Sequence, residues 1–167
     1  MDSQSKRLEG VMMSRLLIWL HAMEALHQQR NDTQWQALEQ LLIDVPRSVF
    51  GPDLNNNQSK AIAYFLDGCL RLFQHQQTNQ PDAAFQYLQF AYAKLQQTSA
   101  DPLTDLIIKD WCMKRLQHLI VLSLEFCQQQ DQTQWHAIAS GLIDAHVSFM
   151  ASLSWNDDQG LHAILIH

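Results

Sequence analysis

Histidine, cysteine and carboxylate side chains are the groups in this sequence with the chemistry for metal binding or catalysis, and their spacing forms no recognised site. The chain has eight histidines, but no two of them stand four residues apart, and the HExxH motif of zinc enzymes is absent. His21 stands three residues before Glu24, and Asp144 stands two before His146. Such pairs are typical of ordinary surface contacts. The sequence predicts no metal site.

Motifs for nucleophilic catalysis and for phosphate binding are also absent. There is no GxSxG, GxxxxGK[ST] or GxGxxG, and the chain holds five glycines in all. Cys69, Cys112 and Cys127 are an odd number of cysteines without CxxC spacing, and each falls inside an apolar helical pattern. We interpret them as small buried hydrophobic residues of a protein in a reducing compartment. The sequence predicts no catalytic residue, no cofactor and no enzymatic activity.

Composition limits the class of fold and of partner. The 167 residues are 47% hydrophobic, with five glycines and four prolines, which is too few for many tight turns between strands. This composition favours a single all-α domain that spans residues 1–167. Seventeen acidic residues against eleven basic ones give a net charge of −6, which opposes nucleic-acid binding. The apolar run near the amino terminus is too short for a membrane span, so we expect a cytoplasmic protein without membrane contact.

Apolar residues that recur every three or four positions predict six helices. In the first helix the predicted buried face is Val11, Met12, Leu16, Trp19, Leu20 and Met23. Pro46 should end the second helix, and Pro81 should open the fourth. The expected ranges are about 8–29, 34–44, 59–77, 81–98, 102–129 and 134–152. These helices pair into hairpins at about 8–50, 58–98 and 102–152.

An internal repeat supports this pairing. Residues 28–50 and 128–150 share ten identities in 23 positions, where chance would give about two. These two segments are one hundred residues apart. A shift of half that length, fifty residues, aligns Trp35, Phe85 and Trp135 at the start of the second helix of each hairpin. An aromatic ring there fills the gap beside the turn. We therefore predict that Trp35 and Trp135 are buried, equivalent and structural.

The middle hairpin resembles a tetratricopeptide repeat. The resemblance rests on AYFLDGCL at 63–70 and on PDAAFQYLQFA at 81–91, with a small residue in the first helix and an Ala-x3-aromatic-x2-Ala rhythm in the second. The loop is several residues longer than is usual, Asp67 stands where leucine is common, and the closing proline is missing. A weaker likeness, to flagellar and type III export chaperones, rests on DTQWQAL at 32–38. The first likeness implies a helical scaffold that binds peptides or protein surfaces.

These observations favour a non-enzymatic protein-interaction module, an adaptor or chaperone-like protein with a protein or peptide partner. The alternative is a helical bundle with an aromatic-lined pocket between the third and fourth helices, acting as a small-molecule sensor or an unrecognised enzyme. The predicted contact stripe lies on the third helix and continues on its neighbours through the fifty-residue repeat. Its members are His21, Tyr64, Asp67, Arg71, His75 and Lys114.

The carboxyl terminus predicts a cap or a dimer contact. Residues 161–166 are apolar but for His162, and only residues 155–160 separate them from the sixth helix. Burying such side chains is worth several kcal/mol, at roughly 25 cal/mol per Å². We expect residues 155–167 to fold back over the third hairpin in a monomer. A homodimer, in which this segment crosses to a second subunit, is the alternative.

Overall fold

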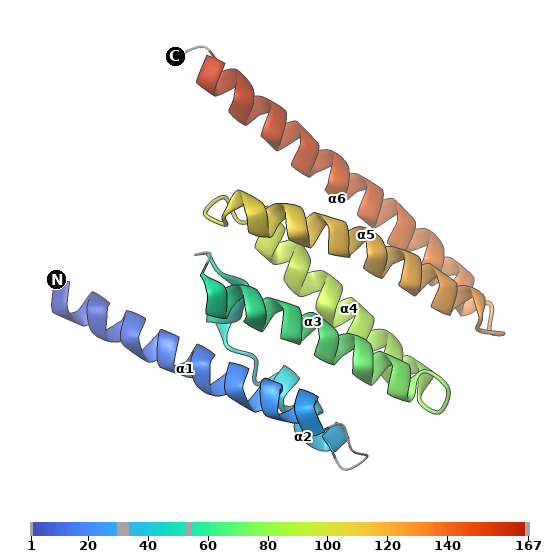
Figure 1. Ribbon diagram of the computed structural model, residues 1–167. Helices are drawn as coiled ribbons and strands as arrows, with labels where there is room; N and C mark the ends of the chain where they lie inside the picture. Colours follow the sequence, from blue (N-terminus) through green and yellow to red (C-terminus); the bar gives the residue numbers. More distant parts are fainter. Residues whose placement is uncertain (1, 30–33, 53–54, 166–167) are drawn as a thin grey trace. The chain divides into compact units, whose positions relative to one another are not determined.

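The computed structural model describes residues 2–29, 34–52 and 55–165, and this part of the chain is all-α, as predicted. It holds six α-helices, one short 3-10 helix and no strand. The helices are α1 Asp2–Gln29, α2 Trp35–Ile43, the 3-10 helix η2 Arg47–Phe50, α3 Asn56–Gln76, α4 Pro81–Ala100, α5 Leu106–Gln128 and α6 Gln134–Leu165 (Figure 1).

The chain divides into two compact units, Met1–Leu116 and Gln117–His167. In the first unit, α3 is the central helix, because it contacts α1, α2, η2 and α4. Figure 1 shows α3 in green beside the blue α1 and the yellow-green α4. Phe65 of α3 is fully buried, with its ring centroid 4.9 Å from that of Phe50 and 5.4 Å from that of Phe90.

A glycine allows the first hairpin to approach α3 closely. Gly68 is buried in the middle of α3. A Cβ atom at this position would lie 3.0 Å from Met23 Cε, 3.1 Å from Leu42 Cδ2 and 3.3 Å from Leu38 Cδ1. These distances are tighter than most real Cβ contacts, so a larger residue would require the side chains of Met23, Leu42 and Leu38 to move.

In the second unit, the part of α5 after Leu116 is joined to α6 by a short turn at residues 129–133. Trp135 is 4% exposed, and its ring meets Phe126 edge to face with 5.3 Å between centroids. The prediction that Trp135 is buried is confirmed. Trp35 is only half-buried, so the predicted equivalence of the two indoles is wrong.

The helix boundaries differ from the prediction at both ends of the chain. α1 already runs from Asp2, although the apolar pattern placed its start at about Leu8. α6 continues to Leu165, so its predicted end at Ser152 is wrong. Residues 155–160, expected to form a loop, belong to this helix. Because an unbroken helix cannot reverse direction there, the predicted fold-back of the terminal segment is corrected too.

The predicted buried face of α1 is confirmed only in part. Leu16, Trp19, Leu20 and Met23 are each at most 4% exposed. Val11 and Met12, expected on the same buried face, are exposed by 51% and 48%. The buried face therefore begins at Leu16, and the apolar side chains before it are left open to solvent.

Candidate functional site

The predicted contact stripe on α3 faces the first hairpin, and its first two members meet His27 of α1. The Tyr64 ring lies edge to face with the His27 ring, with 5.5 Å between centroids. Asp67 Oδ2 lies 3.5 Å from His27 Nδ1. Because both side chains are partly exposed, this ion pair contributes little to stability.

The other two members of the stripe on α3 contact Trp35 at the start of α2. The His75 ring stacks on the Trp35 indole, with 3.9 Å between centroids and 10° between planes. Arg71 places its guanidinium carbon 5.7 Å from the centroid of the same indole, within the range of a cation–π contact. Arg71 and Trp35 are half-buried, and His75 is exposed. Four of the six predicted site residues thus form intramolecular contacts, with His27 or with Trp35.

The remaining two predicted residues are not brought to this cluster. Lys114 Nζ lies 2.9 Å from Asp110 Oδ2, one turn earlier on α5, and both side chains are largely exposed. His21 is exposed on α1 and forms no hydrogen bond, ion pair or ring contact with a described residue. The fifty-residue repeat aligned Lys114 with Tyr64 and His21 with Arg71. Within the described part of the chain, the structure shows no hydrogen bond, ion pair or ring contact of Lys114 or His21 with the other predicted site residues.

The titratable groups offer little reactive chemistry. Within the described residues, no three His, Cys, Asp or Glu side chains are grouped so as to hold a metal ion. All three cysteines are free and buried, as predicted. Burial raises the pKa of the Cys69 thiol far above its usual range and that of Cys112 to about 12. Thiols held in the protonated form are poor nucleophiles.

Sequence reasoning missed an apolar surface on α1. Its residues are 41% to 70% exposed and are Leu8, Val11, Met12, Met13 and Ile18, here called the α1 surface. The signal was present in the sequence, since the apolar spacing continues through the whole helix. Val11 was wrongly assigned to the buried face, because it lies on the opposite side of the helix from Leu20. Met12 lies on the side of Leu16, but spacing does not show whether anything covers it.

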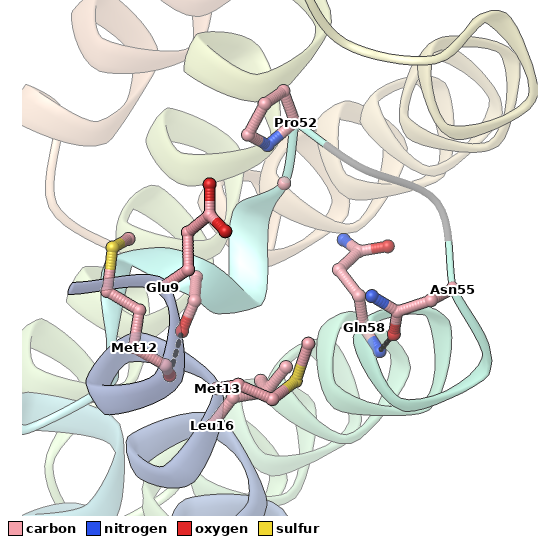
Figure 2. Close-up of a pocket in the computed structure, with 9 residues that line it drawn as sticks. Glu9, Met12, Met13, Leu16, Pro52, Asn55 and Gln58 are labelled. Atoms are coloured by element: carbon pink, nitrogen blue, oxygen red, sulfur yellow. Dashed lines mark hydrogen bonds between the residues drawn. The ribbon is translucent and has the colours of Figure 1, made fainter. Parts of the chain in front are cut away.

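A small pocket lies under the α1 surface, between α1, η2 and the start of α3. Its volume is about 240 Å³, and Figure 2 shows Glu9, Met12 and Met13 on one side of it with Asn55 and Gln58 opposite. Gln58 is 1% exposed and donates a hydrogen bond of 2.8 Å from Nε2 to the Val49 carbonyl. Its Oε1 is buried and accepts no hydrogen bond from the described residues. The pocket is therefore lined by apolar and polar side chains together, and the unpaired Gln58 Oε1 has almost no surface open to it.

A wider groove of about 590 Å³ runs between α1 and the α2–η2 segment, here called the α1–α2 groove. Trp19 forms part of it and donates a hydrogen bond of 2.8 Å from Nε1 to the Leu41 carbonyl. This bond joins the two walls. The lining is six apolar residues and three charged ones, namely Ile18, Trp19, Ala22, Leu41, Val45 and Pro46 with Arg15, Asp44 and Arg47.

None of the helices in the described residues combines the length and the apolar character that crossing a membrane requires.

Comparison with known proteins gave no match: no protein-family model fits the sequence, and no curated protein or solved structure is similar to it.

Proposed function

We propose that this protein is a protein-binding module that holds its partner on the α1 surface. The observation that carries the proposal is the exposure of Leu8, Val11 and Ile18, which are 65%, 51% and 70% exposed. Contiguous apolar side chains on a helix cost free energy in water, and such patches mark sites of interaction. A partner that covers them recovers roughly 25 cal/mol for each Å² of apolar area.

The contact surface is placed on α1 rather than on the stripe of α3. Asp67 and Arg71 already contact His27 and Trp35, so a partner would have to compete with these intramolecular contacts. The side chains of the α1 surface have no such competition. The resemblance of the middle hairpin to a tetratricopeptide repeat supports a binding role, and an adaptor or chaperone-like role fits both features.

The proposal is tested by photo-crosslinking in the organism that makes the protein. A photoreactive amino acid replaces Met12 on the α1 surface and, in a control, Gln86, which is exposed on α4. We expect a discrete protein adduct from position 12 and none from position 86. The double variant Leu8→Glu/Val11→Glu should abolish the adduct, whereas Gln86→Glu/Gln97→Glu, which adds the same charge on α4, should keep it. The absence of an adduct at position 12, or equal adducts at both positions, would disprove the proposal.

A second candidate function, small-ligand binding, is favoured by the pocket of about 240 Å³ between α1, η2 and α3. The matching ligand has an apolar body and a polar group that pairs with the polar lining residues, Asn55 and Gln58 among them. A thermal-shift screen of such compounds should yield stabilising ligands. The variant Gln58→Met should lose the shift. Ligands that stabilise this variant equally would show that they bind elsewhere.

A further inference from the structure

We infer that the α1–α2 groove receives an amphipathic helix of the partner whose apolar face is flanked by carboxylates. This inference rests on the proposed function and adds to it the form and charge of the partner. It follows from the length of the apolar stripe on α1, the construction of the groove and the charge of its lining.

The stripe has the length and spacing of a helix-docking surface. Leu8, Val11, Arg15, Ile18 and Ala22 follow one another at intervals of three or four residues, so they lie on one face of α1. From Leu8 to Ala22 this face extends over about 21 Å, at 1.5 Å for each residue. Arg15, Ile18 and Ala22 of this face line the α1–α2 groove. Leu8 and Val11 extend the face beyond the groove. The whole face matches about four turns of a helix lying along it. Helices that bind in grooves present apolar anchors at the same intervals.

The groove is built into the first hairpin. α2 is only nine residues long and ends at Ile43 before Pro46, and the chain then turns into η2. Val45 and Pro46 from this break line the groove together with Ile18 of α1. The hydrogen bond between Trp19 Nε1 and the Leu41 carbonyl holds the walls together. In the repeat, position 46 corresponds to His146, and α6 continues through it without a break. The groove therefore belongs to the hairpin that contains the proline.

The charges of the lining favour carboxylates on the partner. Arg15 and Arg47 are both exposed, and neither has an ion pair with a described residue. Asp44 also lines the groove and accepts a hydrogen bond of 2.7 Å from Gln40 Nε2. The three charged side chains sum to +1, whereas the whole chain carries −6. Guanidinium groups bind carboxylates in two parallel hydrogen bonds, so an acidic flank can pair with both arginines, whereas a basic flank can pair only with Asp44.

The test uses two synthetic helical peptides of about 18 residues, or about 27 Å. They share one leucine pattern and differ in carrying Glu or Lys beside the apolar face. Binding to the full chain is measured by fluorescence anisotropy at low and high salt. We expect the Glu peptide to bind at least about tenfold more tightly, with a preference that shrinks as salt screens the charges. Equal affinities, or no binding of either peptide, would overturn the inference.

Variants assign the preference to the groove. Arg15→Glu/Arg47→Glu should reverse the preference between the peptides, and Ile18→Asp should weaken both. The matched control Lys60→Glu/Arg115→Glu changes the same total charge at exposed positions outside the groove and should leave the preference unchanged. Loss of the preference in the control instead would move the site away from the groove. Circular dichroism of each variant confirms that it is folded.

Two further results separate this inference from the function on which it rests. If the crosslink at position 12 persists in Arg15→Glu/Arg47→Glu, and both peptides bind equally, the protein is a binding module but the acidic helix is wrong. If no crosslink forms at all, the proposed function fails whatever the peptides do. A concentration-dependent dimer that excludes the Glu peptide, seen by light scattering, would make a second copy the occupant and overturn the inference.

Discussion

The two halves of α1 share one helix and one apolar spacing, yet they differ in exposure. In the carboxyl-terminal half, Leu16 and Leu20 are each 2% exposed, because α2 and α3 cover them. In the amino-terminal half, Leu8 and Val11 are more than half exposed. Val11 lies on the opposite side of the helix from Leu20, and Ile18, which is 70% exposed in the carboxyl-terminal half, lies on the side of Val11. Exposed and buried apolar residues of α1 therefore differ in helix face as well as in position along the helix.

The two halves of α1 contribute differently to folding and to binding. The buried half contributes to the folding of the first unit, since its side chains pack beside Gly68 and against α2. The exposed half adds apolar area that the described part of the chain does not cover. Substitutions in the two halves should therefore separate stability from binding, and the predictions below rest on that separation.

The largest expected difference is between Leu20→Ala and Val11→Ala. Leu20 is fully enclosed, so its truncation should lower the free energy of unfolding by about 2–5 kcal/mol, the cost of lost burial plus a cavity. Val11→Ala should change it by less than about 0.5 kcal/mol, as for other surface positions. Urea denaturation followed by circular dichroism measures both. Comparable losses in the two variants would mean that the amino-terminal half is covered in solution.

Much of the fold was predictable because local chemistry determines it. Pro81 opens α4 as predicted, and Asn55 caps α3 by accepting a hydrogen bond of 2.8 Å from the Gln58 amide. Apolar spacing gave the number and order of the helices. The start of α1 was misplaced because its polar residues continue a helix without adding to the apolar pattern. The end of α6 was misplaced because residues 156–160, a sequence typical of a turn, continue the helix.

The candidate site was less predictable because it depends on contacts between helices. Spacing placed Tyr64, Asp67, Arg71 and His75 on one face of α3, but it could not show that His27 and Trp35 contact that face. Trp35 and Trp135 occupy equivalent positions in the repeat and have different neighbours, so they differ in burial. The groove arises where Pro46 interrupts one copy of the repeat, and its depth depends on the packing of α2 against α1.

Gly68→Ala tests the packing of the buried half from the side of α3. The added methyl group would lie 3.0–3.3 Å from side-chain atoms of Met23, Leu42 and Leu38, so these tightly packed side chains must give way. We expect a loss of about 1–3 kcal/mol, typical of overpacking, although alanine is the better helix former. Thermal and urea denaturation measure the loss. A variant as stable as the natural chain would show that the first hairpin packs less closely on α3.

Trp19→Phe tests the bond that joins the walls of the α1–α2 groove. Leu41 belongs to the last turn of α2, where carbonyl groups lack amide partners within the helix. The Trp19 indole supplies a donor at 2.8 Å. Phenylalanine keeps most of the apolar contact and removes the donor, and we expect a loss of about 1 kcal/mol, since water in the groove can replace it. A loss above about 3 kcal/mol would indicate that the ring, rather than the bond, holds the two helices.

Gly10→Ala should have the smallest effect on the free energy of unfolding, and this effect should be opposite in sign to that of Gly68→Ala. Gly10 lies in the exposed half of α1, and a Cβ atom there would meet nothing within 4 Å. Glycine inside a helix is about 0.5–1 kcal/mol less favourable than alanine, because it loses more backbone freedom on folding. The substitution should therefore raise the free energy of unfolding by up to that amount, while Gly68→Ala lowers it. Alanine adds only one methyl group at position 10, so the crosslink at position 12 and the peptide preference should stay as in the natural chain. No gain in stability would mean that the amino-terminal half does not unfold together with the buried half, and that only a bound partner couples them.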